Sequence, residues 1–149
     1  MICFAVIDTN VIVSAAIKPD SIPGKILALA LSGEIRPVFS REILLEYKKV
    51  LSRAKFCFEK SYVDNVIKTF NIFGDNIVPL RLSAHFEDAD DKKFYEAFVS
   101  LKDERDVYLV TGNIRHFPND ERIVTPRQMT DILKASPGRT WGIDFGKSL

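Results

Sequence analysis

Two short apolar runs, residues 2–7 and residues 107–110, constrain the fold of this chain more than any other feature of its sequence. Neither run alternates between apolar and polar side chains, as a strand with one solvent-facing side would. Unbroken apolar runs of this length are typical of strands buried on both faces, which occur where helices cover a parallel sheet. The sequence therefore predicts a mainly parallel sheet with helices packed against it.

The segments around these runs alternate between strand and helix patterns, which favours an α/β fold. Three further strands are predicted, over residues 36–39, 76–79 and 123–124. Helices are predicted over residues 22–31, from Ser40 as cap to about 53, 60–73, from the acidic cluster near 87 to about 101, and 126–135. We expect a three-layer sandwich over residues 1–135, with a mainly parallel central sheet flanked by helices, and a loose C-terminal tail over residues 136–149.

Composition narrows the class of protein but not its function. A chain of 149 residues has room for one domain, since domains usually hold about 100–200 residues. Its 21 basic and 20 acidic residues nearly cancel, so net charge favours no partner. Two cysteines and two histidines argue against a disulfide framework and a thiolate–imidazole metal site. The N-terminus lacks signal-peptide features and no apolar stretch could cross a bilayer, so we expect a cytoplasmic protein without membrane contact.

Four polar residues from separate parts of the chain are predicted to meet at one edge of the sheet. Asp8 ends the first apolar run and Asn113 follows the second, and the carboxyl ends of parallel strands share an edge. Asp91 lies in the first turn of the preceding helix, and Glu46 lies on the less apolar side of its own helix. Three carboxylates and an amide form an oxygen-rich set, which Mg²⁺ and Mn²⁺ prefer as ligands.

Four motifs in order resemble those of the PIN-domain nucleases. They are Asp-Thr-Asn at residues 8–10, Glu46 within residues 42–51, Asp91 within residues 88–97, and Thr-Gly-Asn with the following residues, 111–118. Residues 123–127 resemble the closing strand and helix start of that family. Each motif is short, but four in order on the predicted elements are specific. The resemblance extends over about residues 2–135 and falls in the VapC-like branch, the toxins of type II toxin–antitoxin systems.

This resemblance implies a Mg²⁺- or Mn²⁺-dependent endoribonuclease. Its substrate would be RNA, and its partner an antitoxin protein whose peptide lies over the acidic pocket. The resemblance also implies a homodimer. The chemistry agrees, because divalent metals held by carboxylates can supply both a nucleophilic water and stabilisation of charge on the phosphoryl oxygens.

The resemblance also assigns roles within the site. Asp8 and Asp91 are implied as the primary metal ligands, and Glu46 as a third ligand or as the residue that orients metal-bound water. Asn113 is implied as a neutral oxygen donor or an outer hydrogen-bonding partner. We expect carboxylates without a metal to repel one another, which raises their pKa values and leaves the site poorly organised. The supporting residues are Thr9, Asn10 and Thr111.

The sequence departs from the family pattern at Asn113 and His116, because many relatives carry an acid at one of these positions. Both side chains are uncharged at neutral pH, which predicts a weaker second metal position or an enzyme with one metal. His116, beside Phe117 and Pro118, is interpreted as a packed or surface residue rather than a general base. Asp120 lies nearby in the sequence and is assigned no role.

Each candidate also has a purely structural interpretation that the sequence leaves open. The motifs that contain Asp8 and Asn113 consist of residue types that favour turns, and Glu46 is typical of a solvated helix face. Asp88 as helix cap, with Asp91 in the first turn, would complement the helix dipole, and this is compatible with metal binding by Asp91. The basic residues near the Glu46 helix form either a phosphate-binding margin or a solvated surface: Lys48, Lys49, Arg53, Lys55 and Lys60.

Two other functions remain open on the sequence. The same chemistry would serve an RNA-processing nuclease without an antitoxin, and a relative without metal could be a non-catalytic module that binds RNA or protein. A phosphatase with an aspartyl nucleophile is disfavoured, because Asn10 stands where that class needs a second acid.

Overall fold

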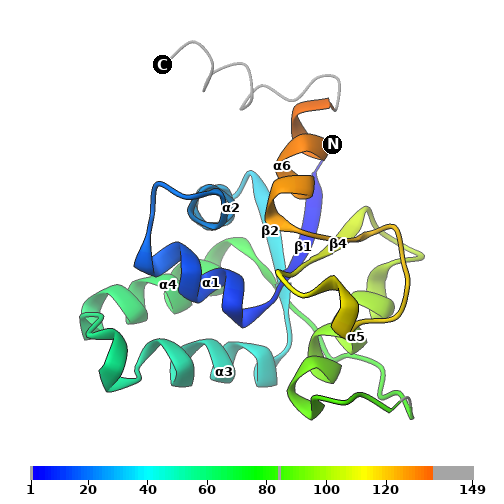
Figure 1. Cartoon of the computed structure of the whole chain (residues 1–149), viewed down its shortest axis with the longest axis horizontal. Helices are drawn as coiled ribbons and strands as arrows, with labels where there is room; N and C mark the ends of the chain where they lie inside the picture. The colour runs from blue at the N-terminus through cyan, green and yellow to red at the C-terminus, as the bar shows by residue number, and fades with distance from the viewer. Residues whose placement is uncertain (1, 84, 136–149) are drawn as a thin grey trace.

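The computed structural model describes residues 2–83 and 85–135 (Figure 1). Its five-stranded sheet has the order β3-β2-β1-β4-β5, and every neighbouring pair is parallel. The two apolar runs form the centre of this sheet. The strands are β1 (Cys3–Ile7), β2 (Ile35–Phe39), β3 (Asp75–Asn76), β4 (Val107–Val110) and β5 (Ile123–Val124).

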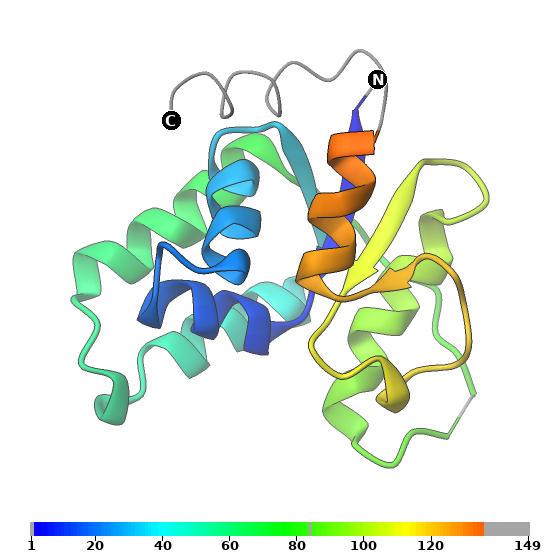
Figure 2. The ribbon, with the colours of Figure 1, turned by 45° about the horizontal axis from the view of Figure 1, so that its top comes forward.

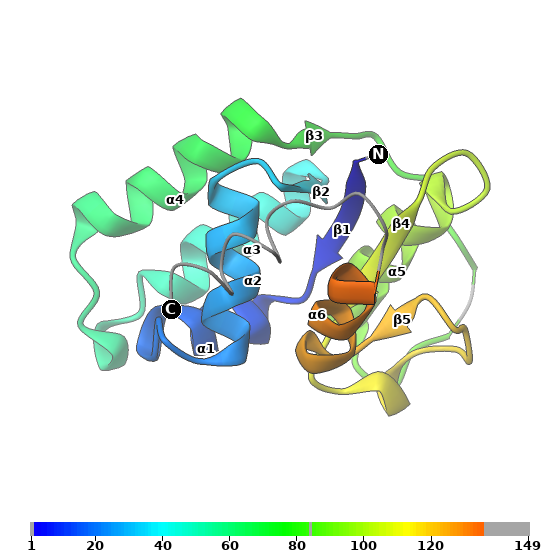
Figure 3. The ribbon, with the colours of Figure 1, turned by 90° about the horizontal axis from the view of Figure 1, so that it is seen from above.

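Six α-helices of the described chain flank the sheet, which confirms the predicted α/β sandwich. They are α1 (Thr9–Ile17), α2 (Ile22–Leu31), α3 (Arg41–Leu51), α4 (Lys60–Phe73), α5 (Ala89–Leu101) and α6 (Pro126–Ala135). Two 3₁₀ turns complete the described elements: η1 (Ala54–Phe56) lies between α3 and α4, and η2 (Ile114–His116) lies between β4 and β5. α6 lies in front of β1, whereas α5 lies behind β4 and packs against the central strands (Figures 2 and 3). No helix among the described residues is long and apolar enough to span a membrane.

The core confirms that the apolar runs are buried on both faces. All five residues of β1 are buried, and the predicted apolar stripe of α5 contributes the buried Phe94 and Phe98. The aromatic rings pack against one another: Phe70 of α4 stacks near Phe39 at a centroid distance of 6.1 Å and meets Tyr47 edge-on at 5.7 Å. These rings therefore join α3 and α4 to the end of β2.

The structure corrects the sequence predictions at two elements. The strand predicted over residues 76–79 is only two residues long, because β2 ends at Phe39, whose carbonyl accepts the last hydrogen bond from the Ile77 N–H at 2.8 Å. Pro79 also lacks an N–H group, and Val78 is 98% exposed. Helix α1 was not predicted, because it is short and rich in β-branched residues, and its three polar residues do not mark a helical period. The proposed tail, residues 136–149, lies outside the described residues.

Candidate active site

Asp8 is a buried acidic residue whose two carboxylate oxygens both accept hydrogen bonds. It follows β1 directly, is 5% exposed, and caps α1 by accepting a hydrogen bond from the Asn10 backbone N–H at 3.3 Å. Its other carboxylate oxygen accepts a hydrogen bond from the Thr111 hydroxyl at 2.7 Å. Because Thr111 follows β4, this bond joins the ends of the two central strands.

Burial raises the pKa of the Asp8 carboxyl above its ordinary value. The hydrogen bonds from Thr111 and Asn10 lower this pKa, and the negative charge of Glu46 raises it. Burial is the largest of these effects, so an ionised Asp8 is held at an energetic cost to the folded protein. A buried anion of this kind favours a bound cation.

Helix α3 anchors the chain on both sides of Asp8. The Glu46 carboxylate accepts a hydrogen bond from the Thr9 hydroxyl, and the Tyr47 hydroxyl donates one to the Ile7 carbonyl. The Tyr47 side chain is fully buried, and burial raises its pKa well above the ordinary value. Adjacent residues of α3 therefore fix the residues immediately before and after Asp8, with Ser40 capping the start of the helix as predicted.

We expect Tyr47→Phe to lower the free energy of unfolding by about 1–2 kcal/mol, because it removes a buried hydrogen-bond donor. Chemical denaturation measures this loss. Tyr62→Phe is the matched control, since the partly buried Tyr62 hydroxyl makes no hydrogen bond to the described chain. Equal effects of the two substitutions would show that the bond to Ile7 does not hold α3 in place.

Asp91 enters the site from the first turn of α5. As predicted, Asp88 caps this helix by accepting a hydrogen bond from the Asp90 backbone N–H at 2.9 Å. Asp91 Oδ2 lies 3.2 Å from His116 Nδ1, which extends from η2. Burial raises the pKa of Asp91, and the nearby charge of Asp88 adds to the rise. His116 therefore lies at the site, a contact that its sequence context did not indicate.

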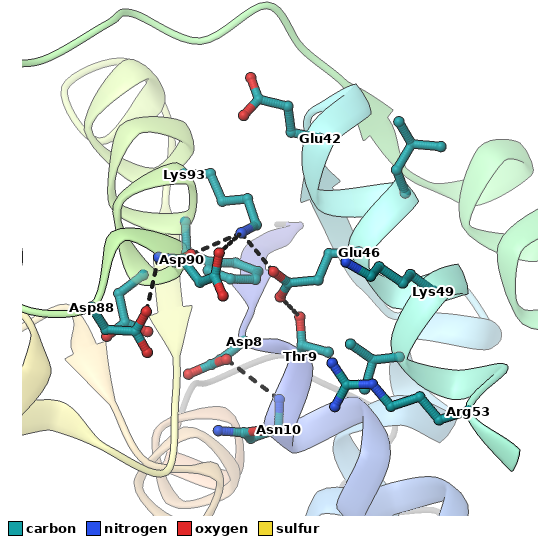
Figure 4. Close-up of a pocket in the computed structure, with 14 residues that line it drawn as sticks. Asp8, Thr9, Asn10, Glu42, Glu46, Lys49, Arg53, Asp88, Asp90 and Lys93 are labelled. Carbon is teal, nitrogen blue, oxygen red and sulfur yellow. Dashed lines mark hydrogen bonds and ion pairs between the residues drawn. The ribbon is translucent and has the colours of Figure 1, made fainter. Parts of the chain in front are cut away.

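A cavity of about 500 Å³ brings most of these side chains together (Figure 4). Asp8, Thr9 and Asn10 lie at one wall, Glu46 of α3 at a second and Asp91 of α5 at a third. Six more charged residues line it: Glu42, Lys49, Arg53, Asp88, Asp90 and Lys93. A neighbouring cavity of about 420 Å³ shares Asp88 and Asp91 with the first and includes His116. Residues far apart in the sequence thus form one acidic hollow at the carboxyl edge of the sheet.

Asn113 and Asp120 lie away from this arrangement. Asn113 is exposed and does not line either of these two cavities, although its backbone N–H donates to the Thr111 hydroxyl oxygen at 3.0 Å. Asp120 precedes β5, at the opposite end of the strands from Asp8, and pairs with Lys102 at 3.2 Å. Asp120 therefore cannot replace the carboxylate that is missing at position 113.

The five basic residues noted near the Glu46 helix divide into two groups. Lys49 and Arg53 line the cavity, and neither forms an ion pair within the described part of the chain (Figure 4). Lys48 is exposed and does not line it. Lys60 pairs with Asp64 at 3.2 Å, and Lys55 lies 5.1 Å from the Phe56 ring centroid. Only the first group is placed to meet a ligand of the cavity.

The donor set of the cavity fits a hard divalent cation, although the side chains do not form a ready-made cage. Within residues 2–83 and 85–135, no three Asp, Glu, His or Cys side chains converge as a metal site. Protein groups engage the carboxylates instead, with Thr111 on Asp8, His116 on Asp91, and Lys93 on Glu46 at 2.6 Å. The pKa values of Asp8 and Asp91 are raised as expected, but burial is the largest cause and repulsion between carboxylates is a smaller one.

Comparison with known proteins agrees with this geometry. Residues 5–115 match the PIN domain family. The chain belongs to this family. It is also similar to the uncharacterized protein MJ1680 of Methanocaldococcus jannaschii, with 32% identity over 146 aligned positions that cover 85% of this chain and 88% of that protein. No solved structure gives a significant match. PIN domains are generally metal-dependent nucleases, so the family agrees with the acidic cavity at the carboxyl edge.

Proposed function

We propose that this PIN domain is an endoribonuclease that uses Mg²⁺ or Mn²⁺ to hydrolyse phosphodiester bonds in RNA. The observation that carries the proposal is the buried carboxylate of Asp8, which shares one cavity with Glu46 and Asp91. Hard divalent cations prefer such oxygen ligands. Asp8 and Asp91 would hold the metal, with Glu46 as a third ligand or as the residue that orients water.

The metal would supply an activated water and would neutralise charge on the phosphoryl oxygens. The protein groups around it have separate tasks. Thr111 and Asn10 orient the two oxygens of Asp8, and Thr9 orients Glu46. Asn113, exposed beyond Thr111, would act from outside the cavity as a hydrogen-bonding partner.

Two cations in and just after α3 support RNA as the substrate. Lys49 lies one helical turn beyond Glu46 on α3, and Arg53 follows the end of that helix. Both line the same cavity, so a phosphate backbone could cross from them to the carboxylates. A nucleic-acid strand with unpaired bases would fit such an open hollow better than a stiff duplex, whose phosphates are held apart from one another.

The metal requirement is the first test of this function. Protein treated with EDTA is expected to leave end-labelled single-stranded RNA intact, and added Mn²⁺ or Mg²⁺ is expected to restore cleavage. Cleavage that persists in EDTA would contradict the proposal and would point to a contaminating, metal-independent ribonuclease. Tight Mn²⁺ binding without cleavage would favour a specific RNA target, whereas absent metal binding would favour the non-catalytic module.

We further propose, from the family resemblance, that the enzyme is the cytoplasmic toxin of a toxin–antitoxin pair. The PIN domain would comprise residues 1–135 with residues 136–149 as a tail, and would form a homodimer. The antitoxin would place a peptide over the acidic cavity. Purified antitoxin candidate from a neighbouring gene should block RNA cleavage at a one-to-one ratio, and a failure to block would favour the RNA-processing alternative.

A further inference from the structure

Lys93 of α5 is an unexpected cation on the acidic side of the cavity. Its Nζ lies 2.6 Å from Glu46 Oε1 and 3.6 Å from Asp90 Oδ1, and it donates a hydrogen bond to the Asp90 carbonyl oxygen at 3.0 Å. The Lys93 side chain is 13% exposed, so this ion pair is largely removed from solvent. It joins α3 to α5 across the mouth of the site (Figure 4).

Both carboxylate oxygens of Glu46 contact protein donors in this arrangement. Lys93 contacts Oε1, while the Thr9 hydroxyl donates to Oε2. The Glu46 side chain is itself only 18% exposed, which leaves little room for a further ligand. A metal ion that binds Glu46 would therefore lie close to the Lys93 ammonium, and the repulsion between these two cations favours departure of the lysine.

We propose that Lys93 is a built-in counterion, which neutralises Glu46 in the metal-free protein and competes with the divalent cation for it. This inference rests on the proposed metal site. Without Lys93, the carboxylates of Glu46 and Asp90 would face the other acids of the cavity uncompensated, and like charges at short range are unfavourable. The flexible four-carbon stem of lysine allows the ammonium to leave once a metal takes over the charge.

The proposal predicts opposite effects of removing Lys93 on two properties, the stability of the metal-free protein and its affinity for metal. Removal of Lys93 should destabilise the metal-free protein, because it leaves a mostly buried carboxylate without its partner. The same removal should strengthen metal binding, because the competitor is gone and the cavity is more negative. A salt bridge that only joins two helices would give the first effect, with unchanged or weaker metal binding.

Lys93→Gln is the test, with two measurements that do not depend on catalysis. Thermal unfolding in EDTA should show a lower midpoint than for the wild type. A Mn²⁺ titration, followed by the paramagnetic resonance signal of the free ion, should show affinity about tenfold tighter, as expected for removing one nearby charge from a partly screened site. Lys93→Arg, which keeps the charge, should stay close to the wild type in both measurements.

Lys92→Gln is the matched control, because it removes the same charge from the neighbouring position of α5, and Lys92 does not line the acidic cavity. Equal tightening of Mn²⁺ binding in this variant, or no tightening in Lys93→Gln, would overturn the counterion role while leaving the metal site intact. If Lys93→Gln is too unstable to titrate, the pairing is tested in a Glu46→Gln background. There, the further change Lys93→Gln should have almost no effect on the stability of the metal-free protein. If the two substitutions instead lower stability by fully additive amounts, the pairing of Lys93 with Glu46 is overturned. A wild-type protein that binds no Mn²⁺ would overturn the proposed metal site and the competition with it.

Discussion

Replacement of Asp8 by asparagine is expected to abolish RNA cleavage and, at neutral pH, to make the protein more stable. The loss of a metal-binding carboxylate should lower the cleavage rate by about 10³-fold or more, since the metal contributes several kcal/mol to the transition state. The free energy of unfolding should rise on the order of 1 kcal/mol, as is common when a functional site is relieved of an unfavourable group. Asparagine can still accept from Asn10, and the Thr111 hydroxyl can turn to accept from the new amide.

The stability gain should depend on pH in a direction that follows from the raised pKa of Asp8. Burial makes the folded protein bind the Asp8 proton more tightly than the unfolded chain does, for which the ordinary value is 3.8. The tighter proton binding stabilises the folded wild type fully when the pH is below the pKa of the unfolded chain. This stabilisation is lost as the pH rises through the pKa of Asp8 in the folded protein. Denaturation at neutral pH should therefore favour Asp8→Asn, and the difference should shrink toward about pH 4 or below.

Two further variants make this result specific. Asp91→Asn should also abolish cleavage but give a smaller stability gain, because Asp91 is less buried than Asp8 and lies beside His116. Asp131→Asn removes an exposed acid of α6, remote from the cavity lining, and should change neither property appreciably. Undiminished cleavage in Asp8→Asn would remove Asp8 from the metal site.

The central sheet and most of the helices could be predicted, because burial on both faces leaves a direct trace in the sequence. The runs that became β1 and β4 contain few polar positions, and residues 22–31 carry a helix with the predicted bounds. Helix α1 could not be recognised, because it is short and its three polar residues do not mark a 3.6-residue period. The length of β3 depends on where its partner β2 ends, and the pairing of the two strands is set by the tertiary structure.

The acidic residues of the site were predictable for a related reason, whereas their partners were not. Asp8 and Asp91 stand next to recognisable strand and helix ends, so topology alone places them near one edge. Lys93 contacts Glu46 and His116 contacts Asp91 through side-chain directions that only the folded chain defines. The i,i+3 spacing of Asp90 and Lys93 was the one local signal, and it predicts an ordinary helix pair rather than a contact with Glu46.

Charge reversal at Lys49 and Arg53 is expected to weaken RNA binding strongly without weakening metal binding, because the added negative charges attract a divalent cation but repel phosphate. Each contributes a cation to the cavity, so Lys49→Glu should lower RNA affinity about tenfold, and the double variant with Arg53→Glu about a hundredfold at low salt. Binding measured with Asp8→Asn as the background prevents cleavage during the titration. The slope of affinity against salt concentration should fall by about one for each phosphate contact that is lost.

Lys48→Glu distinguishes a local contact from a general effect of charge. Lys48 and Lys49 are neighbours on α3, and reversal of either changes the net charge equally, but only Lys49 lines the cavity. If RNA crosses the cavity, Lys48→Glu should weaken binding far less than Lys49→Glu does. Equal losses would mean that RNA responds to the overall field of α3, because a contact inside the cavity cannot be made from a side chain that lies outside it. The RNA would then reach the carboxylates from another direction, and the cavity lining would no longer define the path of the RNA strand.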